Sequence, residues 1–155
     1  VVIRWRDALA RHGKETELGG DLTIGVVTYV ADSQAQGIRE SKKYFQEDMK
    51  MFAPLGFFRG MTDQQLSDLA DPKRAPSAGL PIIDDAVKAG SWLCGPPELI
   101  TERLMELQDK YPGLKGVHVG CTRIGTPLDV MLEQLERFAL EVMPKFKKQA
   151  AMGRG

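Results

Sequence analysis

The sequence predicts an α/β protein built on a parallel sheet. Strand-like runs and amphipathic helical patterns alternate along most of the 155 residues. The run at residues 22–30 is almost continuously apolar and rich in β-branched residues, which is typical of a strand buried on both faces. A chain of this length forms one domain with a real core rather than two.

The first helical pattern covers residues 1–12, where Val2, Trp5 and Leu9 share one face and Gly13 supplies a stop. No residue that could cap the first free N–H groups precedes this pattern. We therefore expect a helix that is truncated at its N-terminus, in a chain that is the C-terminal piece of a longer polypeptide. A processed or tagged start with a frayed first turn is the alternative.

A second helix is predicted after the first strand, because Ser33 and Gln36 have the spacing of a capping box and apolar residues recur at helical spacing as far as Phe52. Proline and glycine then divide residues 53–90 into short pieces, with short helices expected after Thr62 and Pro81. An interrupted segment of this length is typical of a lid or a binding insertion.

Two further strand–helix units complete the chain. Short strands are expected at 91–94 and 116–121, and the helices after them begin at Pro97 and Pro127. The apolar residues of the last helix should face the core; they are Leu128, Met131, Leu132, Leu135, Phe138, Ala139 and Val142.

The edges of the predicted sheet suggest its architecture. Three parallel strands alone would leave both outer strands with unpaired N–H and C=O groups. A (β/α)8 barrel has no edges but takes about 250 residues. We therefore expect three units of such a barrel, with the missing N-terminal part of the barrel supplying the other strands.

Composition argues against several classes of partner and site. Twenty-one basic residues balance 21 acidic ones, so no net charge favours nucleic acid or an anionic membrane. No apolar run approaches the roughly 20 residues of a spanning helix, and the charged start is no signal peptide. With two cysteines and two histidines lacking metal-ligand spacing, we expect no metal site and a cytoplasmic location.

Three segments resemble the C-terminal part of the bacterial-luciferase-like, flavin-dependent monooxygenase family. They are the strand-to-helix passage at 27–33, the Gly90–Glu98 stretch with its Gly-Pro-Pro-Glu turn, and the closing helix at 135–146 with Phe-Ala-Leu-Glu-Val-Met-Pro. The turn departs from the family in having two prolines, Pro96 and Pro97, where one is usual. Those prolines remove two backbone N–H donors.

The resemblance implies strands six to eight of a (β/α)8 TIM barrel in residues 1–149, with a lid-like insertion at 53–90 and a flexible tail at 150–155. It also implies a two-component monooxygenase that uses O2 and reduced FMN, delivered by a flavin reductase, on a small apolar organic substrate. The full protein would be a homodimer, and its catalytic residues would precede residue 1, so none is assigned. The alternatives are a dehydrogenase or reductase that uses the deazaflavin F420, and a non-catalytic flavin-binding or dimerisation half-barrel.

Active sites of barrels lie at the carboxyl ends of the strands. Candidates for the flavin or substrate pocket are therefore Tyr29, Cys94, Gly95 and His118, together with Phe57, Phe58 and Arg59 as a lid that excludes water. Candidates for a phosphate site are Glu98, Leu99, Thr122 and Arg123.

Each candidate also has a purely structural interpretation. His118 lies mid-strand, which suits a core histidine. The phosphate candidates could simply be residues that begin a helix, with Arg123 as a surface arginine. Phe57 and Phe58 could pack the insertion onto the barrel. Cys94 and Cys121 are expected to end neighbouring strands, where they could lie close together or serve as two small buried fillers.

Overall fold

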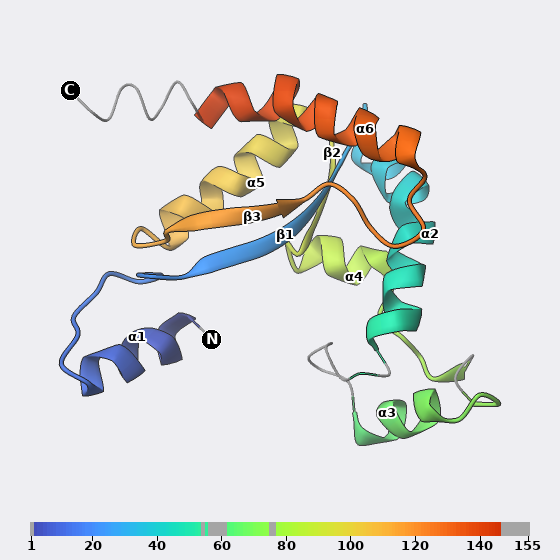
Figure 1. The fold of residues 1–155 in the computed structure, drawn as a ribbon, viewed down its shortest axis with the longest axis horizontal. Coiled ribbons are helices and arrows are strands. Elements are labelled where there is room, and N and C mark those ends of the chain that lie inside the picture. The colour runs from blue at the N-terminus through green and yellow to red at the C-terminus, as the bar shows by residue number, and fades with distance from the viewer. Residues whose placement is uncertain (1, 54, 56–61, 75–76, 147–155) are drawn as a thin grey trace.

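The computed structural model describes residues 2–53, 55, 62–74 and 77–146. A three-stranded parallel sheet lies between helices on both of its faces (Figure 1). The sheet comprises β1 (Thr23–Val30), β2 (Trp92–Gly95) and β3 (Gly116–Gly120). The helices are α1 (Val2–Arg11), α2 (Gln34–Phe52), α3 (Asp63–Ala70), α4 (Ile83–Lys88), α5 (Pro97–Lys110), α6 (Leu128–Arg137) and the π-helical turn η2 (Phe138–Val142).

The prediction of a barrel portion is wrong, whereas the α/β class is confirmed. In a (β/α)8 barrel consecutive strands are neighbours, but here β1 is central and the order is β2–β1–β3. Right-handed crossovers account for this order: α2 packs on one face of the sheet and α5 on the other. The chain therefore moves from β1 to β2 in one direction and returns past β1 to β3. Among the described residues, the outer edges of β2 and β3 meet no further strand.

Each face of the sheet carries its own core. Val27, Trp92 and Cys94 pack against α2 and α4, while Val26, Val30 and Leu93 pack against α5 and η2. The alternation along β1 places odd-numbered residues under α2 and even-numbered residues under α5. β1 is thus buried on both faces, as its continuous apolar run predicts.

The helix starts follow their predicted signals in part. Ser33 Oγ accepts from the Gln36 N–H at 3.2 Å, but the Gln36 side chain donates to Glu40 rather than returning to Ser33. Thr62 and Gln65 form the complete reciprocal box at the start of α3. α4 begins at Ile83, where the Asp85 carboxylate accepts from the N–H of Ile82.

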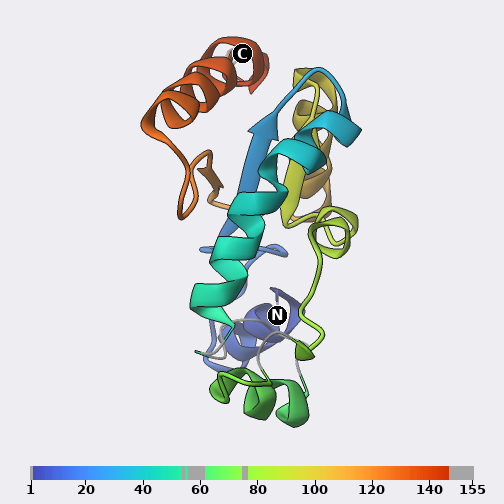
Figure 2. The ribbon, with the colours of Figure 1, turned by 90° about the vertical axis from the view of Figure 1, so that its right-hand side faces the viewer.

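The two helices of the insertion at 53–90 pack differently: α4 joins the core beside α2, with Ile83 fully buried, whereas α3 belongs to a separate small cluster. Leu69 of α3 meets Ala53, Ala78 and Leu80, so this small cluster fixes α3 beyond the end of α2 (Figure 2). The predicted lid residues Phe57, Phe58 and Arg59 lie outside the described residues, as does the tail at 150–155.

The predicted core face of the last helix is partly wrong. Leu128, Leu132 and Leu135 are exposed, and the buried position of α6 is Gln134. Helical periodicity identifies an apolar stripe but not which side of it the sheet lies on. In the turn that follows, Val142 is fully buried against α5 and β1, as expected.

Candidate functional site

A cavity of about 630 Å³ opens on the sheet face that α2 and α4 cover. It forms because α2 and α4 lie over β1 and β2, which leaves β3 uncovered on this side. Gly25 contributes to the open space because it has no side chain to fill it. A Cβ added at this position would meet no atom within 4 Å. The walls include Val27, Phe45, Asp48, Met49, Phe52, Trp92, His118, Gly120 and Arg123.

A buried carboxylate, Asp48, and a partly exposed arginine, Arg123, form the polar wall of this cavity. Arg123 Nε lies 3.1 Å from Asp48 Oδ2 without a well-aligned hydrogen bond. The other oxygen of the carboxylate, Oδ1, is buried and has no hydrogen-bond partner among the described residues. A buried acceptor without a donor is costly, so this atom requires an explanation.

The environment of Asp48 disfavours its charged form. Burial raises the pKa of Asp48 above its ordinary value of 3.8, and the Arg123 cation and the backbone N–H of Ile124 oppose this only in part. A donor placed against Oδ1 would stabilise the carboxylate.

The loop after β3 holds Arg123 in position. Thr126 contacts both backbone groups of Arg123: its Oγ1 accepts from the Arg123 N–H at 3.2 Å, and its own N–H donates to the Arg123 carbonyl at 3.0 Å. The guanidinium carbon lies 5.8 Å from the centre of the Trp92 ring. Trp92 is in turn fixed by an edge-to-face contact with Phe45, at 5.3 Å between ring centres.

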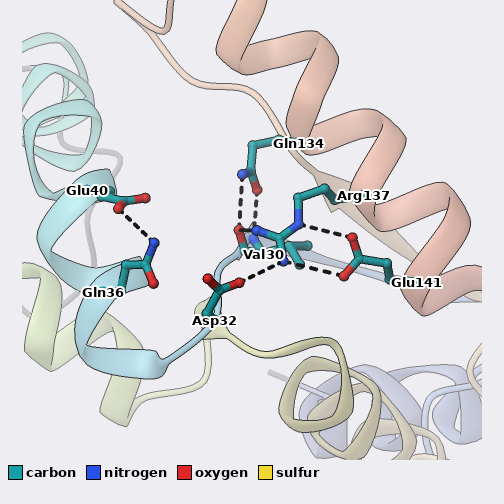
Figure 3. A network of polar contacts seen from close by, with 7 residues as sticks. All are labelled: Val30, Asp32, Gln36, Glu40, Gln134, Arg137 and Glu141. Atoms are coloured by element: carbon teal, nitrogen blue, oxygen red, sulfur yellow. Dashed lines mark hydrogen bonds and ion pairs between the residues drawn. The ribbon is translucent and has the colours of Figure 1, made fainter.

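The carboxyl end of β1 is a second polar region, and the molecule's own side chains fill it (Figure 3). β3 pairs with β1 only as far as Val27, so on that side the backbone of Val30 has no neighbouring strand, although β2 pairs with it on the other side. The Gln134 amide replaces the strand: Oε1 accepts from the Val30 N–H at 2.7 Å and Nε2 donates to the Val30 carbonyl at 3.1 Å. Arg137 adds a contact to the same carbonyl and binds Glu141 and Asp32.

This second region lies at the topological switch point of the sheet. In open α/β sheets, ligands bind where successive crossovers leave a strand in opposite directions, which here is between β1 and β3. Gln134 closes the carboxyl end of that crevice. The loop after β3 also borders the Asp48–Arg123 cavity, through Arg123.

The structure brings two of the sequence-predicted site residues together, His118 and Arg123, on the wall of this cavity. Tyr29 lies on the same sheet face nearer the carboxyl end, 6.4 Å from the Tyr44 ring. Burial, followed by the Glu40 charge, raises the pKa of Tyr29 to about 12, so its phenol is neutral at physiological pH.

The phosphate candidates do not form one cluster. Glu98 and Leu99 begin α5, which packs on the other face of the sheet, and neither they nor Thr122 line the cavity. Gly95 has a left-handed backbone with φ 134°, and a Cβ there would lie 3.2 Å from the Gln34 Cα atom. Its described role is thus the close approach of α2 to β2.

Cys94 and Cys121 lie on opposite sides of β1, so the expectation that they end neighbouring strands is wrong. Cys94 Sγ contacts Ser41 Oγ at 3.5 Å, and Cys121 Sγ contacts Thr28 Oγ1 at 3.4 Å. Burial raises the pKa of both thiols, which disfavours the nucleophilic thiolate.

The candidates predicted from the sequence do not include Asp48. The signal was present in the spacing, since Asp48 follows Phe45 by three residues and precedes Phe52 by four. Trp92 and Phe45 are likewise absent from the predicted candidates. No feature of the sequence shows that an open strip of β3 lies in front of them.

Searches against protein-family models and against curated proteins find no match. Among solved structures, the fold is similar to the crystal structure of the monooxygenase RslO1 from Streptomyces bottropensis, with a TM-score of 0.60 and 13% identity. The match covers 94% of this chain but 36% of that protein, so the chain spans about a third of the monooxygenase's length. At this identity the similarity shows a shared fold. It leaves the luciferase-like family as an inference from the sequence.

Two searches of the described ranges complete the description of the site. They contain no group of three or more His, Cys, Asp and Glu residues placed to hold a metal ion. In the same part of the chain, no helix has the length and apolar composition needed to cross a membrane.

Proposed function

We propose that this chain functions in a flavin-dependent oxidoreductase, a two-component monooxygenase that uses reduced FMN and O2, and that the Asp48–Arg123 cavity receives the flavin ring. The observation that carries the proposal is the buried, unpaired Oδ1 of Asp48 beside a fixed arginine. The sequence resemblance and the fold shared with a protein named a monooxygenase support the same reaction class.

The chemistry of the cavity fits an isoalloxazine ring. One edge of that ring presents an N–H between two carbonyls, which matches an unpaired acceptor next to a cation. The rest of the ring is flat and largely apolar, and the cavity walls include the aromatic rings of Phe45 and Trp92 and the apolar side chain of Val27. A volume of about 630 Å³ lies within the range of small-molecule sites.

The residues of this chain then have separable roles. Asp48 would accept the ring N–H once its buried Oδ1 turns into the cavity, and the Arg123 cation would stabilise negative charge on the ring. The apolar wall of Phe45, Met49 and Trp92 excludes water. When bound, the reduced flavin supplies the two electrons with which one oxygen atom of O2 enters the substrate and the other leaves as water. A small apolar substrate fits these walls.

Titration of the purified chain with FMN, riboflavin and the deazaflavin F420 tests the proposal. We expect Asp48→Ala and Arg123→Ala each to weaken binding about tenfold, since a charge-assisted hydrogen bond contributes about 1.5–3 kcal/mol. Asp109→Ala and Arg103→Ala, at exposed positions of α5, are matched controls and should leave the affinity unchanged. Equal affinity for FMN and riboflavin would reject a phosphate site at Glu98, Leu99, Thr122 and Arg123.

The outcomes separate the alternatives. Binding of F420 in preference to FMN would indicate the dehydrogenase or reductase branch. Binding of FMN without oxygen incorporation into aldehydes, alkanes or terpenes, in an assay coupled to a flavin reductase, would indicate a non-catalytic module. Failure of all three flavins to bind, or binding that is indifferent to Asp48 and Arg123, would refute the assignment of the cavity.

A further inference from the structure

His118 lies on the sheet floor of the Asp48–Arg123 cavity, beside two positions that carry no side chain. It pairs with Gly25 of β1, and Gly120 follows it two residues later on the same face of β3. All three residues line the cavity. The imidazole is exposed and has no hydrogen-bond partner among the described residues, so it is open to a ligand.

The described fold does not require either glycine. Neither has a positive φ. A Cβ added at Gly25 would meet no atom within 4 Å, and one at Gly120 would meet the Val26 carbonyl oxygen at 3.7 Å, an ordinary contact. Glycine weakens a strand and often marks a place where a ligand or another backbone comes close. Since no described atom occupies the space above Gly25, a ligand is favoured.

The polar groups of the cavity form two sets. Asp48, with 7% of its side chain exposed and one oxygen unpaired, belongs with Arg123, to which the flavin ring is assigned. Asp85 also lines the cavity, but its carboxylate accepts from the Ile82 N–H. His118 is therefore the group left for the second reactant.

We infer that the substrate is a planar aromatic ring bearing a hydroxyl group, and that His118 is a catalytic residue that accepts the hydroxyl proton. The ring lies flat on the backbone at Gly25 and Gly120, where a side chain would hold it away. This inference rests on the proposed function, because it names the substrate class of that reaction.

The proton moves between two named atoms. The substrate O–H bond breaks, its proton passes to an imidazole nitrogen of His118, and its electron pair stays on the substrate oxygen. The electron-rich ring then takes one oxygen atom of O2, so that a ring C–H becomes C–OH. The other oxygen atom leaves as water with the two electrons of the reduced flavin, and His118 returns its proton to the product oxygen.

Binding of 2-naphthol to the purified chain, without flavin, tests the inference. Naphthalene lacks the hydroxyl group and 2-decalol lacks the planarity, so we expect 2-naphthol to bind about tenfold more tightly than either. His118→Leu should remove the preference over naphthalene, whereas His12→Leu, at an exposed position outside the cavity, should keep it. Fluorescence reports the proton, because naphthol and naphtholate emit at different wavelengths. The bound probe should emit as naphtholate in the native chain and as naphthol in His118→Gln, which keeps an acceptor but no base.

Filling the floor of the cavity gives a second measurement. Gly25→Val should weaken 2-naphthol binding at least about tenfold without lowering the urea midpoint, because valine is a better strand residue and has room there. Gly116→Val is the matched control: its position in β3 also has room for a Cβ but does not line the cavity, so the affinity should be unchanged.

FMN affinity separates this inference from the proposed function. Asp48→Ala should weaken binding of FMN but not of 2-naphthol, and His118→Leu should do the reverse. If FMN does not bind while 2-naphthol behaves as expected, the flavin assignment fails and the aromatic site stands. Failure of 2-naphthol to bind, equal affinity for naphthalene, or emission that is indifferent to His118 would overturn the inference.

Discussion

Arg137 and Arg123 each contact a carboxylate beside the sheet, and the two regions differ in how completely their polar atoms are paired. Around Arg137, the Val30 N–H and carbonyl, the Gln134 amide and Glu141 all have partners (Figure 3). Around Arg123, one oxygen of the buried Asp48 carboxylate has none among the described residues. A saturated network stabilises the fold, whereas an unsaturated one leaves bonding capacity for a ligand.

The largest expected effect follows from removing the Gln134 amide. Gln134→Leu leaves the buried N–H of Val30 without an acceptor, so we expect a loss of about 2–3 kcal/mol in the free energy of unfolding. Urea denaturation measures it. Gln108→Leu, an exposed glutamine on α5, should change stability by less than about 0.5 kcal/mol. Flavin affinity of the folded Gln134→Leu protein should be unchanged, and a lost affinity would show that the two regions are coupled.

A smaller, pH-dependent effect is expected at Arg123. Arg123→Leu leaves Asp48 unpaired and should cost about 1–3 kcal/mol at pH 7, less than for a fully buried pair because Arg123 is partly exposed. The pKa of Asp48 is already raised, so its ionised form costs stability as pH increases above 3.8 and through the folded-state pKa. Without Arg123 that pKa rises further. The difference between variant and native protein should therefore be smallest near pH 4 and grow toward pH 7.

The source of that difference can be isolated with a second substitution. Asp48→Asn removes the ionisation, so the double variant Arg123→Leu/Asp48→Asn should recover most of the stability lost at pH 7 and lose the pH dependence. A single variant whose deficit is the same at pH 4 and pH 7 would show that packing against Trp92, rather than the charge of Asp48, is what Arg123 contributes.

Local signals in the sequence predict the elements well but not their arrangement. The β-branched run of β1, the Thr62–Gln65 cap and the proline at the start of α5 all act within a few residues, and each has its expected effect. The strand order depends on which face each crossover helix covers. Nothing within α2 or α5 separately specifies that choice. The sequence therefore did not distinguish the observed open sheet from the predicted barrel.

The same distinction applies to the candidate site. Arg123 could be chosen because it follows a predicted strand closely, and His118 because it lies within that strand, so β3 alone places both of them. Asp48 could not be recognised as their neighbour, since α2 is joined to β3 only through the order of the strands. Gln134 was hidden because its function is to replace a strand, which helical periodicity does not reveal.

The smallest expected effect lies at the rim of the saturated region. Asp32 contacts Arg137 Nη2 at 3.4 Å, but 82% of its side-chain surface is exposed. Solvent screens such a pair, and Arg137 keeps Glu141 and the Val30 carbonyl when it is removed. Asp32→Asn should thus change the free energy of unfolding by less than about 0.5 kcal/mol in urea denaturation. A loss above about 1 kcal/mol would mean that Asp32 is needed to hold Arg137 on Val30, and that this network has no spare contacts.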